Sequence, residues 1–190
     1  MEKSHKQQQF LFAFMVKSIK YEIVKKTGKV EIRRYPSTII AKVSNCENDS
    51  FGLLFRFISG QNREKAKVKM TAPVFSQEIK MTTPVISDFS GSGYMAFVMP
   101  AEFVLETTPE PLDNRVKIEM VPERYVAALR FSGSWSEANF VAKTRELLEE
   151  LAKAKVKTKG NVFSMLYNPP FTPWFLRRNE VAIEVEPQWQ

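Results

Sequence analysis

The chain contains the stretch Val30-Glu-Ile-Arg-Arg-Tyr-Pro-Ser-Thr-Ile-Ile-Ala-Lys-Val43 and repeats its pattern at Val116-Lys-Ile-Glu-Met-Val-Pro-Glu-Arg-Tyr-Val-Ala-Ala-Leu129. Each copy alternates apolar and polar residues, meets a proline, and then continues as an apolar run. Alternation with a period of two residues is typical of a half-buried strand, and a proline between two such runs indicates a turn. We therefore predict the same pair of strands in each half of the chain.

A first helix is predicted directly after the first strand pair. Asn48-Asp49-Ser50 offers side-chain oxygens for the N-cap, and Ser59-Gly60 is a typical helix end. Between them, apolar residues recur at i, i+3, i+4 and i+7. They are Phe51, Leu54, Phe55 and Ile58.

A second, longer helix is predicted after the second strand pair. Ser134-Trp135-Ser136-Glu137 fits a capping box, and Gly160 ends the region. One apolar stripe is expected along this helix, made of Val141, Thr144, Leu148 and Leu151.

The chain returns to strands after each helix, so the fold class predicted is α+β. The expected strands cover 68–86 and 94–100 in the first half, and 162–167 and 180–186 in the second. Two ββαβ-type units of this kind must bury their apolar faces against each other, and a cleft at their junction is a usual place for a small ligand.

The expected domain organisation follows from the repeat and from the proline-containing linker at 107–114. We predict an N-terminal extension (1–19) and one domain (20–187), whose half-repeats cover about 20–106 and 115–187.

Composition and charge exclude some classes of protein. The 190 residues are 44% hydrophobic, which is ample for a packed interior and argues against disorder. The net charge is +7, but residues 1–35 hold nine basic and three acidic side chains, so most of the excess lies there. Because the rest of the chain carries no basic stripe and no known reader motif, we predict no nucleic-acid partner.

The N-terminal segment and the single cysteine bear on location. Cys46 cannot form an internal disulfide, which favours a cytoplasmic protein. The apolar segment Phe10–Val16 is too short to span a bilayer, and Lys17-Ser18 follows it in place of a signal-peptide cleavage site. Two alternatives remain for this segment: it is an extension that packs on the core or frays, or it makes weak contact with a membrane surface beside its lysines.

Most catalytic templates are missing from the sequence. The only histidine, His5, lies in the N-terminal tail, so no Ser-His-Asp or Cys-His arrangement is available in the domain. No Cys or His cluster has metal-ligand spacing, and no glycine-rich phosphate loop is present. We therefore predict a protein that is not an enzyme and holds no dedicated metal site.

The predicted first helix is the candidate ligand surface. Its apolar stripe is either ordinary core or the floor of a cleft, with Arg56 beside Phe55 at the rim. An aromatic floor next to a guanidinium suits a flat apolar ligand that carries carboxylates, because arginine pairs with carboxylate through two parallel hydrogen bonds.

Two proline-containing motifs complete the pattern. Lys69-Met-Thr-Ala-Pro-Val74 and Lys80-Met-Thr-Thr-Pro-Val85 each read as a strand interrupted by proline, which belongs at an edge or a bend. The stretch Tyr167-Asn-Pro-Pro-Phe-Thr-Pro-Trp-Phe-Leu-Arg-Arg-Asn-Glu-Val181 reads as a rigid aromatic loop followed by a strand. This loop either staples the C-terminal part to the core or forms one lip of the cleft.

These motifs together resemble the SOUL haem-binding protein family. The resemblance rests on Tyr167–Val181, on Lys69–Val74 and on Phe131-Ser-Gly-Ser-Trp-Ser136, and it covers roughly Tyr21 to Glu186. It implies a distorted antiparallel β-barrel flanked by two helices, with two pseudo-symmetric halves. It also implies a soluble protein that binds haem or a related tetrapyrrole and has no established reaction.

The resemblance also implies a set of binding residues. On the first helix they are Phe51, Leu54, Phe55 and Arg56, and in the loop after the double proline they are Phe171 and Thr172. Some family members use an axial histidine, which this domain lacks, so haem would be held by burial and carboxylate contacts or ligated weakly by Met, Tyr167 or Cys46. The expected function is carriage, buffering or sensing of a tetrapyrrole, without iron specificity.

One alternative is a structural or protein-interaction role with an empty cleft. Another comes from a second resemblance, to the drug-binding fold of GyrI-like effector domains. In that case a cleft carboxylate, Glu119 or Glu180, would face a cationic ligand or activate water for hydrolysis.

Overall fold

The computed structural model describes residues 17–44, 49–76, 93–168 and 171–187. The second proline motif (80–85), Cys46, His5 and the apolar segment 10–16 lie outside these residues. The described strands are β1 (Lys17–Ser18), β2 (Glu22–Thr27), β3 (Val30–Tyr35), β4 (Thr38–Ser44), β5 (Thr71–Ser76), β6 (Tyr94–Val98), β7 (Val116–Val121), β8 (Arg124–Phe131), β9 (Thr158–Leu166) and β10 (Asn179–Val185). The helices are α2 (Ser50–Ile58) and α3 (Glu137–Lys153), with 3-10 turns η1 (Leu105–Thr107) and η2 (Trp174–Leu176).

The strand order carries the predicted internal symmetry. The strands follow the order β2-β3-β8-β10-β9-β5-β6-β4-β7, with β1 pairing in parallel with β5. Each strand of one repeat has a counterpart in the other: β3 and β7, β4 and β8, β5 and β9, β6 and β10. When all counterparts are exchanged, the order from β3 to β7 becomes the same order in reverse. The predicted α+β fold with two pseudo-symmetric halves is confirmed.

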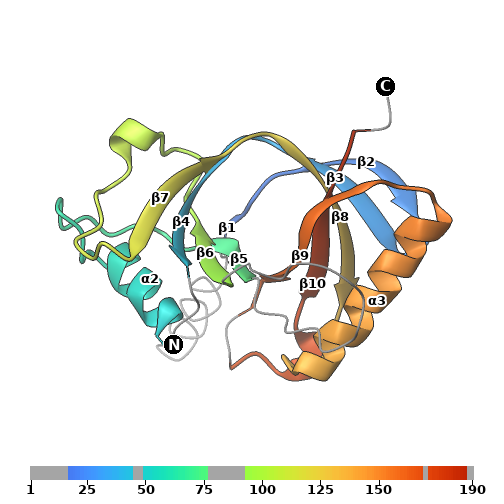
Figure 1. Ribbon diagram of the computed structural model, residues 1–190. Coiled ribbons are helices and arrows are strands. Elements are labelled where there is room, and N and C mark those ends of the chain that lie inside the picture. Colours follow the sequence, from blue (N-terminus) through green and yellow to red (C-terminus); the bar gives the residue numbers. More distant parts are fainter. Residues whose placement is uncertain (1–16, 45–48, 77–92, 169–170, 188–190) are drawn as a thin grey trace, which may run out of the picture.

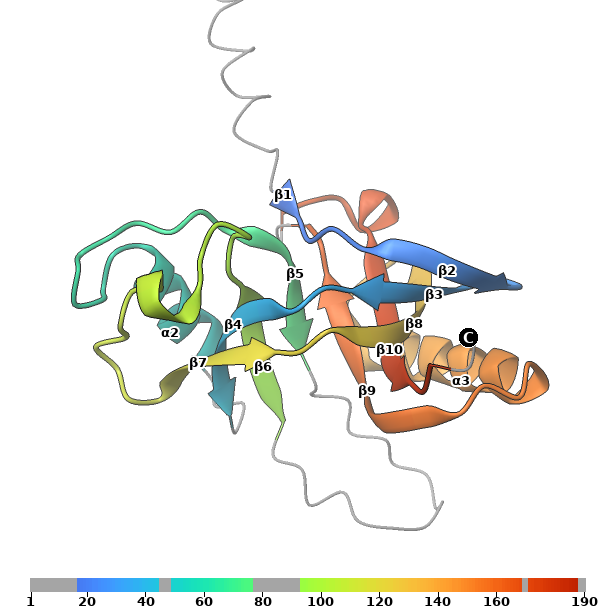
Figure 2. The same cartoon turned by 90° about the horizontal axis from the view of Figure 1, so that it is seen from above.

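The sheet curls into an arch, with α2 and α3 beneath its two ends (Figure 1). β3 continues into β4 through Pro36, and β7 continues into β8 through Pro122, so two long strands pair antiparallel across both halves (Figure 2). Among the described residues the two edge strands, β2 and β7, do not pair with each other. The predicted barrel is therefore a strongly curved but open sheet.

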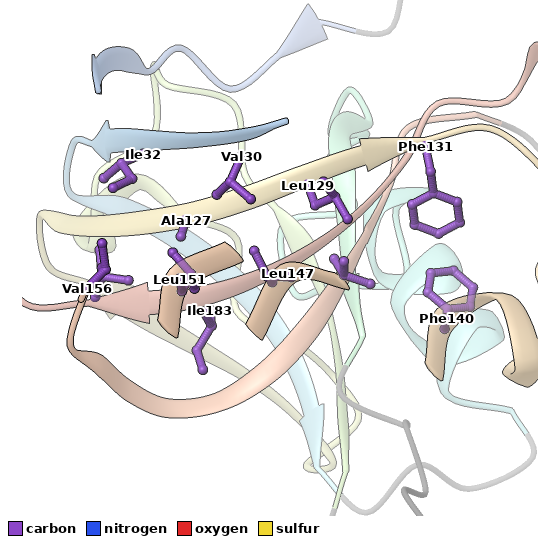
Figure 3. Close-up of a cluster of buried hydrophobic side chains, with 12 residues drawn as sticks. Val30, Ile32, Ala127, Leu129, Phe131, Phe140, Leu147, Leu151, Val156 and Ile183 are labelled. Atoms are coloured by element: carbon purple, nitrogen blue, oxygen red, sulfur yellow. The ribbon is translucent and has the colours of Figure 1, made fainter. Parts of the chain in front are cut away.

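Three apolar clusters fill this architecture. One lies between α3 and strands β3, β8 and β10, and includes Leu147, Leu151 and Val181 (Figure 3). A second lies between α2 and strands β4, β6 and β7. The third, with Phe75, Phe163 and Met165, lines the opposite face of the sheet. No helix in the described part of the chain is long and apolar enough to cross a membrane.

The predicted bounds of α2 agree with the structure, whereas α3 ends at Lys153 and Gly160, the predicted end of that region, lies inside β9. Ser136, not Ser134, is the N-cap of α3, and its hydroxyl accepts from Asn139 N. The buried residues of α3 are Phe140, Thr144, Leu147 and Leu151, so the buried stripe is rotated from the predicted one, and Val141 and Leu148 are half-buried. The rotation arises because α3 covers a curved sheet, whose shape the sequence period does not encode.

The first proline motif forms β5, which is a central strand and not an edge. Its pairing with β6 shifts register between Thr71 and Val74, around Pro73. The missing amide of Pro73 is thus placed at an irregularity of the ladder, and the predicted bend is present.

Candidate functional site

The surface of α2 exposes two stacked aromatic rings. Asp49 is the N-cap of the helix, and Gly60, with a φ of 108°, follows its last turn. Phe51 and Phe55 are 43% and 51% exposed. Their rings lie 6.2 Å apart at an interplanar angle of 10°, and Phe51 also meets the edge of Phe97 at 5.3 Å. This pair forms an apolar surface that is open to solvent.

The other predicted residues of α2 are placed differently. Leu54 is fully buried in the apolar cluster under α2, so its side chain belongs to the core. Arg56 points to another side of the helix, where Nη2 lies 2.8 Å from Oδ2 of Asp49. It lines a hollow of about 110 Å³ together with Leu112 and Asp113.

The hollow next to Arg56 is electrostatically mixed. Hydrogen bonds from Arg115 lower the pKa of Asp113 to about 2, and the charge of Arg56 adds to this effect. Asp113 is therefore ionised at neutral pH. The two rings therefore form the aromatic part of the predicted surface. Arg56 lies on another side of the helix, where it is ion-paired with Asp49.

The predicted loop residues Phe171 and Thr172 belong to the second half of the molecule. Phe171 is 71% exposed, and the carbonyl of Thr172 accepts a hydrogen bond of 2.7 Å from Nε of Arg177. The same loop is attached near the start of α3, where the Gly133 amide donates to the carbonyl of Trp174 at 3.1 Å. The structure shows no contact of either predicted loop residue with Phe51 or Phe55 among its described interactions.

Two of the sequence motifs meet at the base of this loop. Trp135 Nε1 donates to Asn179 Oδ1 at 2.8 Å, and Asn179 Nδ2 donates to the carbonyl of Gly133 at 3.1 Å. The guanidinium of Arg177 lies 4.3 Å from the centre of the Trp135 indole. The loop is therefore stapled to the core at its base, while Trp174, Phe175 and Leu176 stay exposed.

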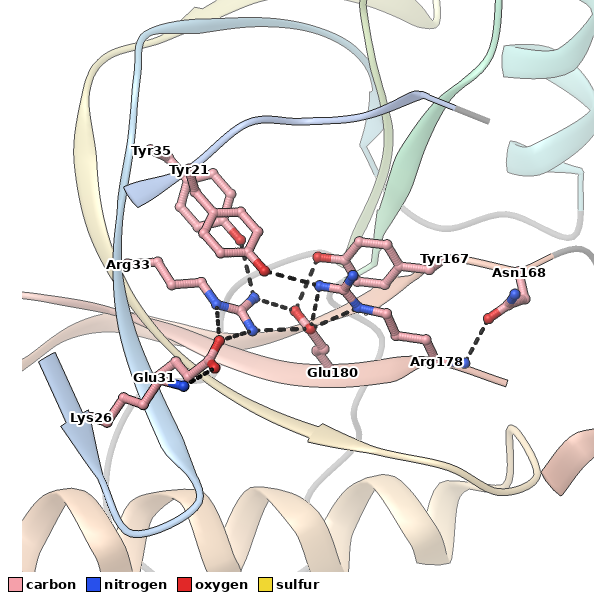
Figure 4. A network of polar contacts seen from close by, with 9 residues as sticks. All are labelled: Tyr21, Lys26, Glu31, Arg33, Tyr35, Tyr167, Asn168, Arg178 and Glu180. Carbon is pink, nitrogen blue, oxygen red and sulfur yellow. Dashed lines mark hydrogen bonds and ion pairs between the residues drawn. The ribbon is translucent and has the colours of Figure 1, made fainter. Parts of the chain in front are cut away.

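A buried polar network occupies the face of the sheet opposite α3 (Figure 4). Glu180 is fully buried, and Arg33 is 2% exposed. Nη1 and Nη2 of Arg33 donate to the Glu180 carboxylate at 2.6 and 3.1 Å. Arg178 donates to the same carboxylate through Nε at 3.0 Å and Nη2 at 2.8 Å, and the Tyr167 hydroxyl donates at 3.0 Å.

Burial and charge within this network shift the pKa values of Tyr167 and Arg33. Burial, followed by the negative charge of Glu180, raises the pKa of Tyr167 well above its ordinary value. Burial opposes the charge of Arg33, but its hydrogen bonds with Glu180 outweigh that effect and raise its pKa. Tyr167 is therefore a poor source of phenolate for an iron ion.

The network was missed at the sequence level, although a signal was available. In β3 the side chain of Arg33 lies on the face opposite Ile32 and on the same face as Tyr35. If Tyr35 points into the protein, Arg33 must point into it as well. The partner residue lies in a strand that follows 147 positions later, which one sequence does not reveal.

The acids proposed for a cationic ligand are already paired. Glu180 accepts from two arginines, and exposed Glu119 lies 3.2 Å from Lys42. In the described parts of the chain, His, Cys, Asp and Glu form no group of three or more that could hold a metal ion.

Comparison with known proteins places the chain in a family. The family described as SOUL heme-binding protein matches residues 16–184. The chain belongs to this family. Heme-binding protein 2 of Homo sapiens is 31% identical to this SOUL protein over 180 residues, which cover 84% of this chain and 83% of that protein.

A second relative carries the same family name, and solved structures share the fold. Heme-binding protein 1 of Sus scrofa is 29% identical over 132 residues, and the match spans 67% of this chain and 65% of that protein. Among solved structures, a hydrolase from Listeria innocua matches with a TM-score of 0.55 and 12% identity, over 95% of this chain and 98% of that one. At this identity the structural match shows a shared fold only.

Proposed function

We propose that this SOUL protein binds haem or another tetrapyrrole on the exposed face of α2, for carriage, buffering or sensing. The observation that carries the proposal is the stacked pair Phe51 and Phe55, which stays open to solvent beside a packed core. Apolar rings in such a place match the flat face of a macrocycle. Arg56 would exchange its ion pair with Asp49 for a carboxylate of the ligand.

The chemistry of these residues fits a tetrapyrrole that lies on a surface. The hollow next to Arg56 has about 110 Å³, whereas pockets that enclose ligands of drug size have about 300–1,000 Å³. The ligand would therefore rest against the two rings, with Leu54 buried under α2, and Phe171 and Thr172 would approach from the loop. The hydroxyl of Tyr167 is engaged by the buried Glu180 carboxylate, which speaks against Tyr167 as the iron ligand.

A titration with haemin and with metal-free protoporphyrin, followed by the Soret band and by tryptophan quenching, tests the proposal. We expect saturable binding of both ligands with similar dissociation constants, on the order of micromolar. Failure of both ligands to saturate would remove the proposal. Much tighter binding of haemin would show that an iron ligand had been overlooked.

The proposed roles differ in how fast the ligand leaves. Transfer of haem to apomyoglobin within seconds would fit a carrier, whereas slow release would fit buffering. The measurement uses the full chain loaded with one equivalent of haemin, and absorbance reports the transfer.

We also propose a weak membrane contact through the N-terminal segment. β1 pairs in parallel with the start of β5, where Lys17 lies opposite Thr71. β9 pairs antiparallel with β5, so its last residue, Leu166, lies toward the same end of β5. The chain thus enters the described structure at the end of β5 from which the exposed loop 171–176 also departs (Figure 2). Co-sedimentation with anionic vesicles tests the contact, and a chain that begins at Lys17 should bind less.

A further inference from the structure

A second hollow lies at the far end of the sheet from α2. It has a volume of about 150 Å³ and opens between β2, β3 and β8, beside the residue that precedes β10, on the face opposite α3. Four cationic side chains line it, with one acid. The cations are Lys29, Arg33, Arg130 and Arg178, and the acid is Glu31.

Arg33 forms the floor of this hollow and has no hydrogen-bonding capacity left. Its Nε and Nη2 donate to Glu31, its Nη1 and Nη2 donate to Glu180, and its Nη1 also donates to the Tyr35 hydroxyl. The ring of Tyr21 covers the guanidinium, with a distance of 4.4 Å between Cζ and the ring centre. The floor is therefore a fixed, buried positive charge.

Arg130 lines the hollow without an acidic partner. It is the direct cross-strand neighbour of Glu180 in the pairing of β8 with β10. The Glu180 carboxylate is already taken by Arg33, Arg178 and Tyr167. Within the described part of the chain, the exposed guanidinium of Arg130 has neither an ion-pair nor a hydrogen-bond partner.

Arg178 contributes further unused donors. Its Nε and Nη2 are bound to Glu180, and Nη2 also donates to the Tyr21 hydroxyl at 3.2 Å. Its Nη1 donates to no other side chain among the residues described. Lys29 is paired with Glu146 of α3 at 3.0 Å, so three guanidiniums remain beside two carboxylates, Glu31 and the buried Glu180, and the hollow carries excess positive charge.

We propose that this hollow binds a small oxyanion, a phosphate or carboxylate group, between Arg130 and Arg178. Arginine offers paired N–H donors that match such oxygens, and these charge-assisted bonds are the strong ones. The volume suits one phosphate or a small carboxylic acid, since it lies below the range of about 300–1,000 Å³ for larger ligands. The site is separate from α2 and does not depend on tetrapyrrole binding.

Calorimetric titration with inorganic phosphate and, separately, with citrate tests the proposal at constant ionic strength. We expect saturable binding of at least one anion by the full chain, and binding weaker by about tenfold in Arg130→Gln. Tighter binding of phosphate would identify a phosphate ligand, and tighter binding of citrate a carboxylate ligand.

Arg145→Gln is the matched control, because Arg145 is an exposed arginine on α3 without a side-chain partner among the described residues. It should bind both anions as the unmodified protein does. Equal weakening in the two variants, or no saturation with either anion, would overturn the proposal. Arg130→Gln should also keep its melting temperature and its haemin affinity, which separates this result from a failure at α2.

Discussion

Arg33 and Glu180 form an ion pair inside the protein, with Nη1 of Arg33 2.6 Å from Oε2 of Glu180. Both side chains are shielded from water, and they join β3 to β10, which do not neighbour each other in the sheet but are both paired with β8. The pair thus ties together strands from the two halves of the chain.

Removing the acid of this pair should be severely destabilising. We expect Glu180→Gln to lower the free energy of unfolding by about 3–5 kcal/mol, because it leaves a buried guanidinium without its counter-charge. Urea denaturation of the two proteins measures the difference. The double variant Arg33→Met/Glu180→Leu should recover part of the loss, and a double variant less stable than Glu180→Gln would contradict the explanation.

Alkaline pH should weaken the fold through Tyr167. Its pKa in the folded protein is raised by burial, while the unfolded chain releases the proton near the ordinary value of 10. Since the folded state binds this proton more tightly, the stability that it contributes is complete below about pH 10 and is lost as the pH rises above it.

Unfolding in urea at pH 8 and at pH 10.5 measures this effect. Tyr167→Phe is the control, because it keeps the ring and removes the titrating group, and it should lose less stability between the two pH values. An equal loss in both proteins would assign the alkaline effect to other groups, such as Tyr35.

Removal of one buried polar atom at the centre of α3 should stabilise the protein. Thr144 is fully buried, and its hydroxyl has no hydrogen-bond partner in the described structure. Thr144→Val keeps the shape and removes the desolvated hydroxyl, so it should raise the free energy of unfolding by about 1 kcal/mol. Thr144→Ser should not show this gain, and a destabilised Thr144→Val would indicate a hidden partner for the hydroxyl.

The exposed rings of α2 should matter for the ligand and little for folding. Phe55→Ala is expected to weaken haemin binding about tenfold, through the loss of about 1.4 kcal/mol of ring contact, with a small change in melting temperature. Met120→Ala, which alters another exposed apolar side chain, is the control. The contribution of the Arg56 guanidinium to haemin binding is measured with Arg56→Gln. Arg63→Gln is its control, because both arginines are exposed and ion-paired.

The two hydrogen bonds of the Asn179 side chain should hold the aromatic loop 171–176 against the start of α3. Asn179→Ala removes the acceptor of Trp135 and the donor to Gly133, and should cost about 2 kcal/mol or more. Chymotrypsin should then cleave faster within 171–176. Trp135→Phe removes only one of the two bonds and should give a smaller change, and unchanged cleavage in both variants would show that the loop is held elsewhere.

The sequence predicted the features that depend on local pattern. The repeat of Val30–Val43 at Val116–Leu129 indicated the paired strands, because alternation reports directly which face is buried. The bounds of α2 followed from its cap residues. The stripe of Phe51, Leu54, Phe55 and Ile58 was one face in the sequence, but in the structure Leu54 and Ile58 are buried whereas Phe51 and Phe55 stay exposed.

The remaining features depend on contacts between distant strands. Glu180 is buried only because Arg33, Arg178 and Tyr167 converge on it from β3, from the start of β10 and from the end of β9. The unpartnered guanidinium of Arg130 is a consequence of that convergence. Neither can be predicted from composition or from the hydrophobic period.

The symmetric strand order makes this chain comparable to a homodimer whose two copies have been fused. In a true homodimer every substitution occurs twice, so a new site always arises in duplicate. Fusion removes that constraint. Arg33 and its counterpart Glu119 illustrate the result, because one is buried in a charged network and the other lies exposed beside Lys42. The two ends of the sheet can therefore differ, with an aromatic surface at the end that carries α2 and a basic hollow between both repeats at the other end, and the common scaffold is retained.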